Sequence, residues 1–282
     1  MANRKGFTLI ELLVVIAIIA LLMSILMPAL GRVKRQAQAV ACTSNLRTWG
    51  LLFKLYTDDS NGYFNEGWGY SHHHSGADDR IGLWMNALRP YYEDEWDLLL
   101  CPTATRVVND LQQDWGTFKA WHRDIPNRYP GPKEGGQKDF VSSYGINNWT
   151  NYMLKARGAR PAANFWKSVQ NVKNPNAVPL FADSTWHDAW PWEHDTPIQQ
   201  PYGFGWGSPG TTDEMNHFCI DRHSGWTNFA FCDWSVRKVG LKELWTLDWH
   251  AHYEDNGPSP WTKAGGVLPA DWPKWMRHYK DY

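Results

Sequence analysis

The chain has 282 residues and a formal net charge of −1, so it offers no chain-wide electrostatic case for nucleic-acid binding. Its 19 tryptophans, all of them beyond residue 48, predict a globular part that is unusually aromatic inside or on its surface. Because glycine and proline are frequent and long periodic runs are few, we expect short strands and loops there rather than a helical bundle.

The chain begins with a short basic stretch, residues 1–6, that ends in Gly6. An apolar run follows from Phe7 to Leu30, and Glu11 is its only charged residue. The run is long enough to cross a bilayer as a helix. By the positive-inside rule the basic stretch stays in the cytoplasm, and the remainder of the chain is exported.

The position of the glycine distinguishes this segment from an ordinary secretory signal, which is cut after its apolar region. The string Lys5-Gly6-Phe7-Thr8-Leu9-Ile10-Glu11-Leu12 closely resembles the processing site of type IV pilins and type II secretion pseudopilins. The resemblance implies that a prepilin peptidase cuts between Gly6 and Phe7 and that Phe7 is then methylated. The apolar helix would remain on the mature chain.

Two residues of the apolar run call for an explanation. A carboxylate in hydrocarbon costs roughly 3 kcal/mol, so Glu11 needs a partner. The resemblance implies that this partner is the new amino group of Phe7 on a neighbouring subunit; the alternative is a tolerated charge that reaches toward the interface. Pro28 removes one backbone hydrogen bond and predicts a kink or local melting, at the place where pilin-like proteins carry a proline.

Beyond the apolar run, helical spacing of apolar residues predicts an amphipathic continuation over residues 31–61. Asn61-Gly62 is a helix-stop signal. Because no Gly/Ser-rich linker intervenes, we favour one continuous helix over an independent helix on a flexible tether. The expected apolar stripe consists of Leu30, Val33, Ala37, Val40, Leu46, Trp49, Phe53 and Tyr56.

Residues 62–282 are expected to form a globular head. The fold class is α+β, with the long N-terminal helix packed on a small, mainly antiparallel sheet with long Trp-rich loops. The clearest strand signal is a hairpin with Asp233-Trp234 at its turn. The other expected elements are a short helix over 82–91 that ends near Pro90, buried segments at 98–102 and 142–147, a strand at 179–183, and an ordered tail over 261–282.

His223 and Asp233 are ten positions apart, which resembles the H-X9-D-G element of planctomycete-type pilin-like proteins. Trp234 stands where that element has its glycine, which leaves the type of turn open but not the hairpin.

The chain has four cysteines, and an even count in an exported chain predicts two disulfides. The expected pairs are Cys42 with Cys101 and Cys219 with Cys232, which is one of three connectivities. Free buried thiols are the alternative. None of the four has a spacing typical of a zinc motif.

Calcium in a head loop is a second expectation about ligands, although no cofactor is required. Asp183, Asp188 and Asp195 concentrate the hard oxygen ligands that calcium prefers, while a solvated acidic loop is the favoured alternative. For His72-His73-His74 an exposed polar loop is favoured over a transition-metal site.

No spacing is diagnostic of catalysis, and we expect no enzyme. The acid–base candidates without a catalytic pattern are Asp183, His187, Asp188, Asp221, His223 and Asp233. Exposed aromatic rings can stack on sugars, but core or subunit-interface packing is favoured for the aromatic region of Trp186, Trp190, Trp192 and Trp206.

The resemblance implies a structural subunit of a type II secretion or type IV pilus-like filament. Its partners would be copies of itself, the prepilin peptidase, the assembly platform and the inner membrane. The precursor would span the inner membrane once with its head in the periplasm, and later join a periplasmic or cell-surface filament. The alternative is a minor or membrane-resident pseudopilin whose Trp-rich head binds a carbohydrate or a secreted substrate.

Overall fold

The computed structural model describes residues 9–67, 82–93, 95–107, 116–124, 139–201, 213–253, 255 and 257–282. The predicted cleavage site at Gly6 and Phe7, the histidines 72–74 and Trp206 lie outside these residues.

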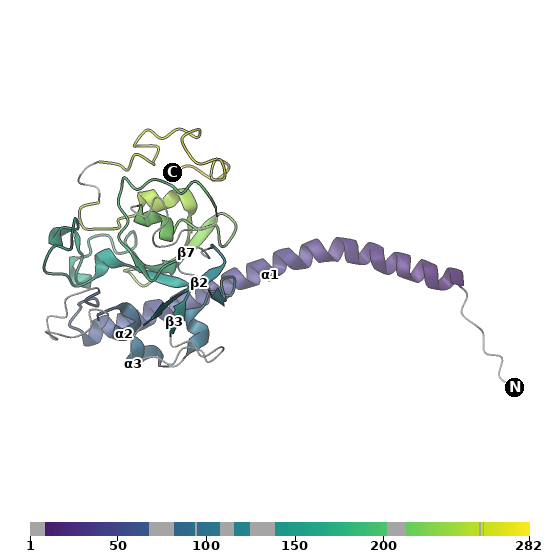
Figure 1. Ribbon diagram of the computed structural model, residues 1–282, viewed down its shortest axis with the longest axis horizontal. Helices are drawn as coiled ribbons and strands as arrows, with labels where there is room; N and C mark the ends of the chain where they lie inside the picture. The colour runs from purple at the N-terminus through teal and green to yellow at the C-terminus, as the bar shows by residue number, and fades with distance from the viewer. Residues whose placement is uncertain are drawn as a thin grey trace.

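Helix α1 (Leu9–Asp59) is one continuous helix of 51 residues, about 77 Å long at 1.5 Å per residue. It has two parts. Residues 9–37, the shaft, project from the head, and residues 38–59, the docked half, pack along it (Figure 1). In the described part of the chain, α1 is the one helix long and apolar enough to cross a membrane, a criterion that a signal sequence also meets. The predicted continuous helix is therefore present.

The helix continues through Pro28, so the predicted local melting is wrong. Pro28 has no N–H to donate to the Ser24 carbonyl, yet the residues on both sides remain helical. The ribbon curves gently along its length and does not break (Figure 1). One missing hydrogen bond is a small loss in a long apolar helix, whose other backbone groups remain bonded within it.

The end of α1 agrees with the predicted stop signal. Asn61 and Gly62 adopt positive φ values of 53° and 84°. The Gly62 N–H donates to the Thr57 carbonyl over 2.7 Å, which closes the last turn in the manner of a Schellman motif. Glycine and asparagine tolerate this left-handed backbone at low cost, which explains why the pair ends the helix.

The head contains a five-stranded sheet in the order β6-β4-β5-β7-β8. Neighbouring strands are antiparallel except β4 and β6, which are parallel. The predicted hairpin is β7–β8, and the predicted strand at 179–183 is β5. The strand bounds are β4 Tyr144–Asn147, β5 Pro179–Asp183, β6 Asp188–Ala189, β7 Trp226–Phe231 and β8 Val236–Gly240.

A smaller sheet in the order β1-β2-β3 lies beside the first. Its bounds are β1 Arg106–Val107, β2 Lys119–Asp124 and β3 Asp139–Ser142, with β1 and β2 parallel and β2 and β3 antiparallel. The predicted α+β fold with mainly antiparallel strands is thus observed. The predicted helix over 82–91 is instead two short helices, α2 Trp84–Ala87 and α3 Arg89–Tyr92. Pro90 lies in the first turn of α3, where its missing N–H costs nothing.

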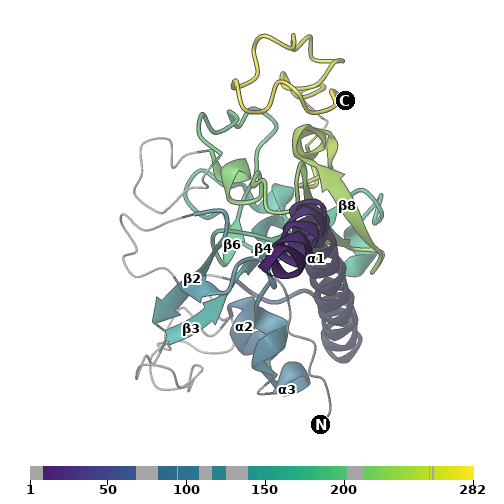
Figure 2. The ribbon, with the colours of Figure 1, turned by 90° about the vertical axis from the view of Figure 1, so that its right-hand side faces the viewer.

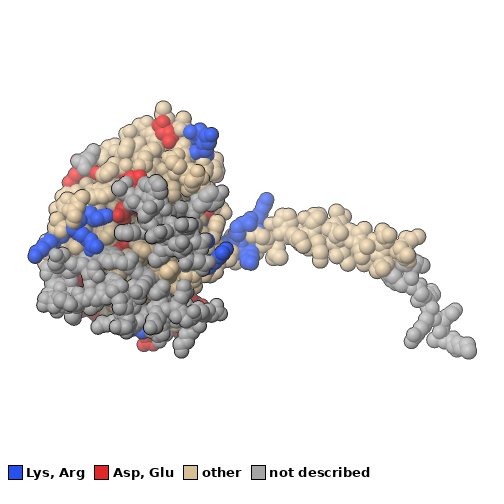
Figure 3. Space-filling view, in the orientation of Figure 1, with Lys and Arg blue, Asp and Glu red and all other residues tan. Residues whose placement is uncertain are grey.

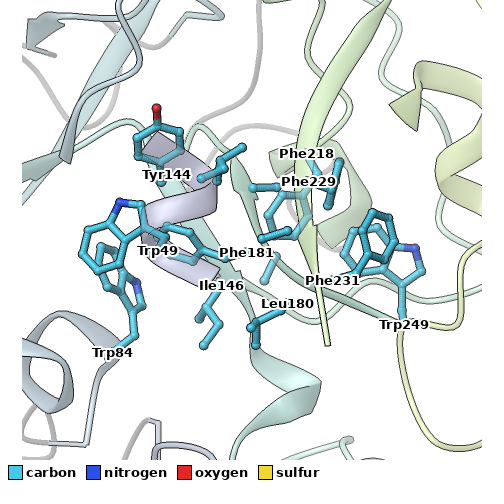
Figure 4. Close-up of a cluster of buried hydrophobic side chains, with 14 of the residues drawn as sticks. Trp49, Trp84, Tyr144, Ile146, Leu180, Phe181, Phe218, Phe229, Phe231 and Trp249 are labelled. Carbon is cyan, nitrogen blue, oxygen red and sulfur yellow. The ribbon is translucent and has the colours of Figure 1, made fainter. Parts of the chain in front are cut away.

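The two faces of the large sheet bury different aromatic groups (Figure 4). Phe181 faces the docked half, with its ring centroid 5.2 Å from that of Trp49. Phe229, on the neighbouring strand, points the other way and lies 5.8 Å from Trp249. The alternation follows from the strand period of two, because Phe229 pairs with Ala182 and not with Phe181. The sheet is therefore covered on one face by α1 and on the other by C-terminal loops.

The predicted apolar stripe on α1 is correct only in its second part. Leu46, Trp49 and Phe53 are buried against the head, whereas Leu30, Val33 and Val40 are exposed. The helix turns its Ala39 and Cys42 side toward the sheet instead. A head that begins only near residue 38 cannot cover Leu30 and Val33, and Val40 lies on the side of the helix that faces away from the sheet.

Residues 261–282 form the predicted ordered tail, drawn in yellow above the head (Figure 2). Trp272 and Met276 are buried, and the Trp275 indole N–H donates to the Ile198 carbonyl over 2.9 Å. Lys242 pairs with Asp281 over 2.6 Å, with the Lys242 side chain wholly buried.

Candidate functional site

The shaft exposes apolar side chains on every side. Each large apolar residue that the structure describes from Leu9 to Met27 is exposed. The carboxylate residue Glu11 lies near its free end and is also exposed. Lys and Arg side chains gather where the shaft meets the head, and Arg32, Lys34 and Arg35 occupy this stretch (Figure 3). The shaft can bury its surface only in a lipid bilayer or against other helices.

The apolar surface continues from the shaft onto the outer side of α1. A shallow hollow there is lined by Val33, Gln36, Ala37, Val40, Ala41 and Ser44. Small residues in such a strip allow another helix to approach closely. The strip includes Val33, Ala37 and Val40, three of the predicted stripe positions that the head leaves uncovered.

At the start of the docked half, four side chains meet in the interior. The Cys42 thiol lies 3.3 Å from Asp183 Oδ2. His223 Nε2 lies 3.1 Å from the same oxygen and 3.5 Å from Cys101 Sγ. Cys42 comes from α1, Asp183 from the end of β5, and the other two from loops. These four residues are the Cys–His–Asp cluster, and all are buried.

The Asp183 carboxylate organises the charges of the cluster. Burial alone would raise the pKa of Asp183, but the His223 imidazole and the Arg222 guanidinium hold it well below its usual range. Burial likewise acts to lower the pKa of His223, and the Asp183 carboxylate overcomes this and raises it to about 9. Arg222 Nη1 donates to Asp183 Oδ1 over 3.1 Å. The aspartate is therefore ionised in the folded protein.

The two thiols differ in their surroundings. The pKa of Cys42 is raised well above its ordinary value, chiefly by burial. Burial also acts to raise the pKa of Cys101, but hydrogen bonds from Cys42 and His223 and the charge of Arg222 lower it to about 6. Tyr144 Oη donates toward Cys42 Sγ at 3.5 Å.

Comparisons with known proteins concern the N-terminal segment. The model of the prokaryotic N-terminal methylation motif matches residues 1–27. The chain is also 44% identical over 63 residues to the major component PilA4 of the type IV wide pilus of Thermus thermophilus, an alignment that covers 22% of this chain and 48% of that protein. In these matched parts the chain is similar to type IV pilin-like proteins. It spans about half the length of the relative it matches, and no solved structure matches it.

The two residues of the H-X9-D element lie in different surroundings. His223 joins the Cys–His–Asp cluster, whereas Asp233 is exposed in the turn of the β7–β8 hairpin. Asp233 Oδ1 accepts the Ser235 N–H over 2.9 Å. Trp234 adopts a φ of 69°, the left-handed conformation that a glycine would take without strain. The sequence departs from the element at the position where glycine is the favoured residue.

Neither predicted disulfide is present, because all four cysteines are free and buried. Cys42 and Cys101 do lie close together, as expected, but each thiol has polar partners other than the second sulfur. Cys219 lies near the start of β7, where Thr227 hydrogen-bonds to Phe218, and Cys232 follows its end. A strand of this length separates them by about 17 Å, beyond the reach of a disulfide.

The predicted calcium ligands do not converge, because each aspartate has its own partners. Asp188 accepts from the Asn148 side chain over 2.5 Å. Asp195 accepts the N–H groups of Trp192 and Met215 over 3.0 and 2.8 Å. Asp183 belongs to the Cys–His–Asp cluster. Among the residues that the structure describes, that cluster is the one group of three or more His, Cys, Asp or Glu side chains placed to hold a metal.

The aromatic region proposed as a stacking surface is mostly interior. Trp186 and Trp190 are buried, and Trp192 is half-buried. The Arg160 guanidinium lies 4.1 Å from the Trp190 ring centroid, which stabilises the pair by a cation–π interaction. The described members of this group therefore favour packing over ligand stacking.

Sequence reasoning found all four residues of the Cys–His–Asp cluster but assigned them to three different roles. Arg222, which balances the charge of Asp183, gave no signal because nothing in its sequence neighbourhood places it near residue 183. The proximity of Cys42 and Cys101 was the one correct hint.

Proposed function

We propose that this chain is a structural subunit of a type IV pilus-like or type II secretion-like filament. A prepilin peptidase would cut the precursor after Gly6, and the shaft would hold it in the inner membrane. The shafts of many subunits would then leave the membrane and pack together. The observation that supports this most strongly is an exposed apolar shaft continuous with a helix that is rigidly docked on a head.

The apolar side chains of the shaft would need to be covered both before and after assembly. Before assembly, lipid covers its apolar side chains; after assembly, neighbouring shafts cover them. Repetition of one contact between different surfaces of each subunit generates a helical fibre when the rotation does not close. The apolar strip that includes Val33 and Val40 would extend these helix–helix contacts toward the heads. The basic residues at the junction would lie among lipid headgroups before assembly.

Glu11 would set the register of assembly. Its carboxylate lies within the apolar shaft, where a charge is expensive unless it is paired. Cleavage after Gly6 would create an amino group at Phe7, and a neighbouring subunit would bring that group to Glu11. A shaft in the wrong register would leave both charges unpaired in an apolar surrounding.

The experiment compares Glu11→Ala with Ser24→Ala, a control that changes another polar residue of the shaft. We expect Glu11→Ala to insert into the membrane at the normal level but to be missing from isolated filaments. Ser24→Ala should be incorporated normally. Incorporation of Glu11→Ala at the level of the unmodified chain would contradict the role of the carboxylate.

The N-terminus of the subunit supplies an independent test. Mass spectrometry of filament protein should find chains that begin at a methylated Phe7. Filaments built from chains with an intact Met1 would refute processing. The abundance of the subunit separates a major subunit, which dominates the preparation, from a minor pseudopilin, which is scarce.

A further inference from the structure

Four side chains with metal-binding atoms converge from distant parts of the sequence. Asp183 is 141 residues from Cys42 and 40 from His223, and Cys101 is 122 residues from His223. Their four ligand atoms all lie within 4.8 Å of one another, and all four residues are buried. The sequence gives no zinc motif for these residues, because such motifs place pairs of ligands only a few residues apart.

Three distances between ligand atoms of the Cys–His–Asp cluster match those of a tetrahedral shell. With the bond lengths usual for zinc, a sulfur ligand lies about 3.5 Å from a nitrogen or oxygen ligand, and nitrogen lies about 3.3 Å from oxygen. Here Cys42 Sγ is 3.3 Å from Asp183 Oδ2, and Cys101 Sγ is 3.5 Å from His223 Nε2. His223 Nε2 is 3.1 Å from Asp183 Oδ2. Oδ2 contacts both Cys42 and His223 and is therefore the ligand atom, while Oδ1, 3.4 Å from Cys42 Sγ, accepts the hydrogen bond from Arg222.

The charges of the buried site would also balance. Two thiolates and one carboxylate contribute three negative charges, and a divalent ion with the Arg222 guanidinium contributes three positive charges. Arg222 is buried and donates to Asp183 Oδ1 over 3.1 Å. Neutrality matters here because an uncompensated charge in the interior is costly.

Hydrogen bonds from neighbouring side chains orient the two cysteines, as outer partners do in established metal sites. Tyr144 Oη lies 3.5 Å from Cys42 Sγ, and Thr103 Oγ1 lies 3.0 Å from Cys101 Sγ. Pro102, Thr103 and His223 also line a hollow of about 620 Å³ between the basic end of the shaft and the head. This hollow is the route by which an ion would enter.

We propose that Cys42, Cys101, Asp183 and His223 bind one zinc ion in a closed, structural site. Thiolate and imidazole ligands in a tetrahedral arrangement select zinc over calcium or magnesium, which prefer oxygen shells. Four protein ligands leave no position for water or substrate, so the site is structural and not catalytic. The ion takes the place of the protons held at the two sulfurs and at Nε2, which pass to solvent, so the thiols bind as thiolates and His223 binds as a neutral imidazole. The ion joins α1 to β5 and to two loops of the head.

The alternative for the two sulfurs is a disulfide between Cys42 and Cys101. It would form when an oxidant in the compartment to which the chain is exported removes the two thiol hydrogen atoms. Zinc and the disulfide exclude each other, because bonded sulfurs are no longer thiolate ligands. The proposal is independent of filament assembly, because zinc content is measured on the unassembled chain.

The test uses the full chain, extracted from membranes in detergent without a histidine tag and dialysed against buffer containing zinc and then against metal-free buffer. Elemental analysis should find about one zinc ion per chain. Replacement of the zinc by cobalt(II) should give the visible absorption of a tetrahedral thiolate site. Less than about a tenth of a zinc ion per folded chain would overturn the proposal, as would a Cys42–Cys101 disulfide in most of the molecules.

Variants assign the ion to these residues. Cys101→Ser should lose the zinc and the cobalt absorption, whereas Cys219→Ser, which removes an equally buried thiol outside the cluster, should retain both. If Cys101→Ser does not fold, Asp183→Asn and His223→Gln take its place in the test, because each replaces a ligand with a neutral polar side chain of similar size. A chain with His72, His73 and His74 all changed to Ala should keep its zinc. Loss of the ion from that variant, or its retention by every folded cluster variant, would refute the assignment.

Discussion

The indole of Trp49, in the docked half of α1, meets the indole of Trp84 on α2 edge to face, with ring centroids 5.1 Å apart. Phe181 of β5 closes the group, 5.2 Å from Trp49 and 4.8 Å from Trp84. The Trp49 N–H donates to the Leu98 carbonyl over 2.9 Å, so the buried ring has no unsatisfied polar atom. One residue thus joins the helix, the sheet and the segment around η1 (Trp96–Leu99).

Trp49→Ala should destabilise the head by about 4 kcal/mol, because it removes a large buried ring and leaves a cavity and an unpaired carbonyl. Chemical denaturation of the full chain in detergent measures the loss. Leu51→Ala is the matched control, since Leu51 lies on the same helix but is 59% exposed. A loss of similar size for both variants would contradict the assigned packing.

The head should lose stability in mild acid because of His217. Burial lowers the pKa of this histidine to about 4, below its ordinary value of 6.5. A lowered folded-state pKa means that the unfolded chain binds the proton first. The stabilisation is complete above pH 6.5 and declines by about 1.4 kcal/mol per pH unit as the pH falls toward 4.

His217→Gln should flatten the pH dependence of the unfolding free energy between pH 6.5 and pH 4, even if it lowers the stability at neutral pH. His194→Gln, at an exposed histidine, should leave the slope unchanged. An unaltered slope in His217→Gln would show that other groups cause the acid sensitivity.

The left-handed backbone conformation of Trp234 is unfavourable for a residue with a Cβ, and glycine would adopt it without this strain. A residue with a Cβ pays about 1–2 kcal/mol in the left-handed conformation that Trp234 adopts at φ 69°. Both Trp234→Gly and Trp234→Ala lose the half-buried ring, so their difference isolates the backbone term. We expect the glycine variant to be more stable than the alanine variant by about 1 kcal/mol, measured by thermal or urea unfolding. Equal stabilities would mean that the turn relaxes.

The C-terminal tail should come loose when Lys242 is replaced. Its side chain is wholly buried, pairs with Asp281 over 2.6 Å and lies 4.9 Å from the Trp272 ring centroid. Lys242→Ala leaves a partly buried carboxylate without its partner and should cost about 3 kcal/mol. Limited proteolysis should then cut residues 261–282 faster. Lys274→Ala, at an exposed tail position, should leave the cleavage rate unchanged.

Local signals in the sequence correctly predicted the elements that have a strong apolar periodicity or clear stop and turn residues. The length of α1, its stop at Asn61-Gly62 and the β7–β8 hairpin each depend on residues within a few positions of one another. The apolar stripe was wrong as far as Val40, because spacing alone reveals neither where the head begins nor which side of the helix it covers. Pro28 was predicted to kink or locally melt the helix, and of these the melting is not observed, because the residues on both sides remain helical.

The candidate sites also differ in whether their residues are close together in the sequence. The segment around Glu11 was recognisable because its glycine, carboxylate and apolar run are contiguous. The Cys–His–Asp cluster was not, because β5, the loop before β7 and the docked half bring together residues up to 141 positions apart. His223 and Asp233 are related by spacing, yet one lies in the interior and the other in a turn.

The continuity of α1 has a mechanical consequence. In the proposed fibre, a pull along the axis would reach each head through the helical backbone of α1, which is continuous from the shaft to the docked half. The docked half is then loaded parallel to its own axis, so that its contacts with β5, β7 and β8 resist in shear and share the force. Tension arrives first at the entry of the helix into the head, where Cys42 lies, and only afterwards at Trp49 and Phe53. The junction of shaft and head is therefore the place where a cross-link would strengthen the subunit most.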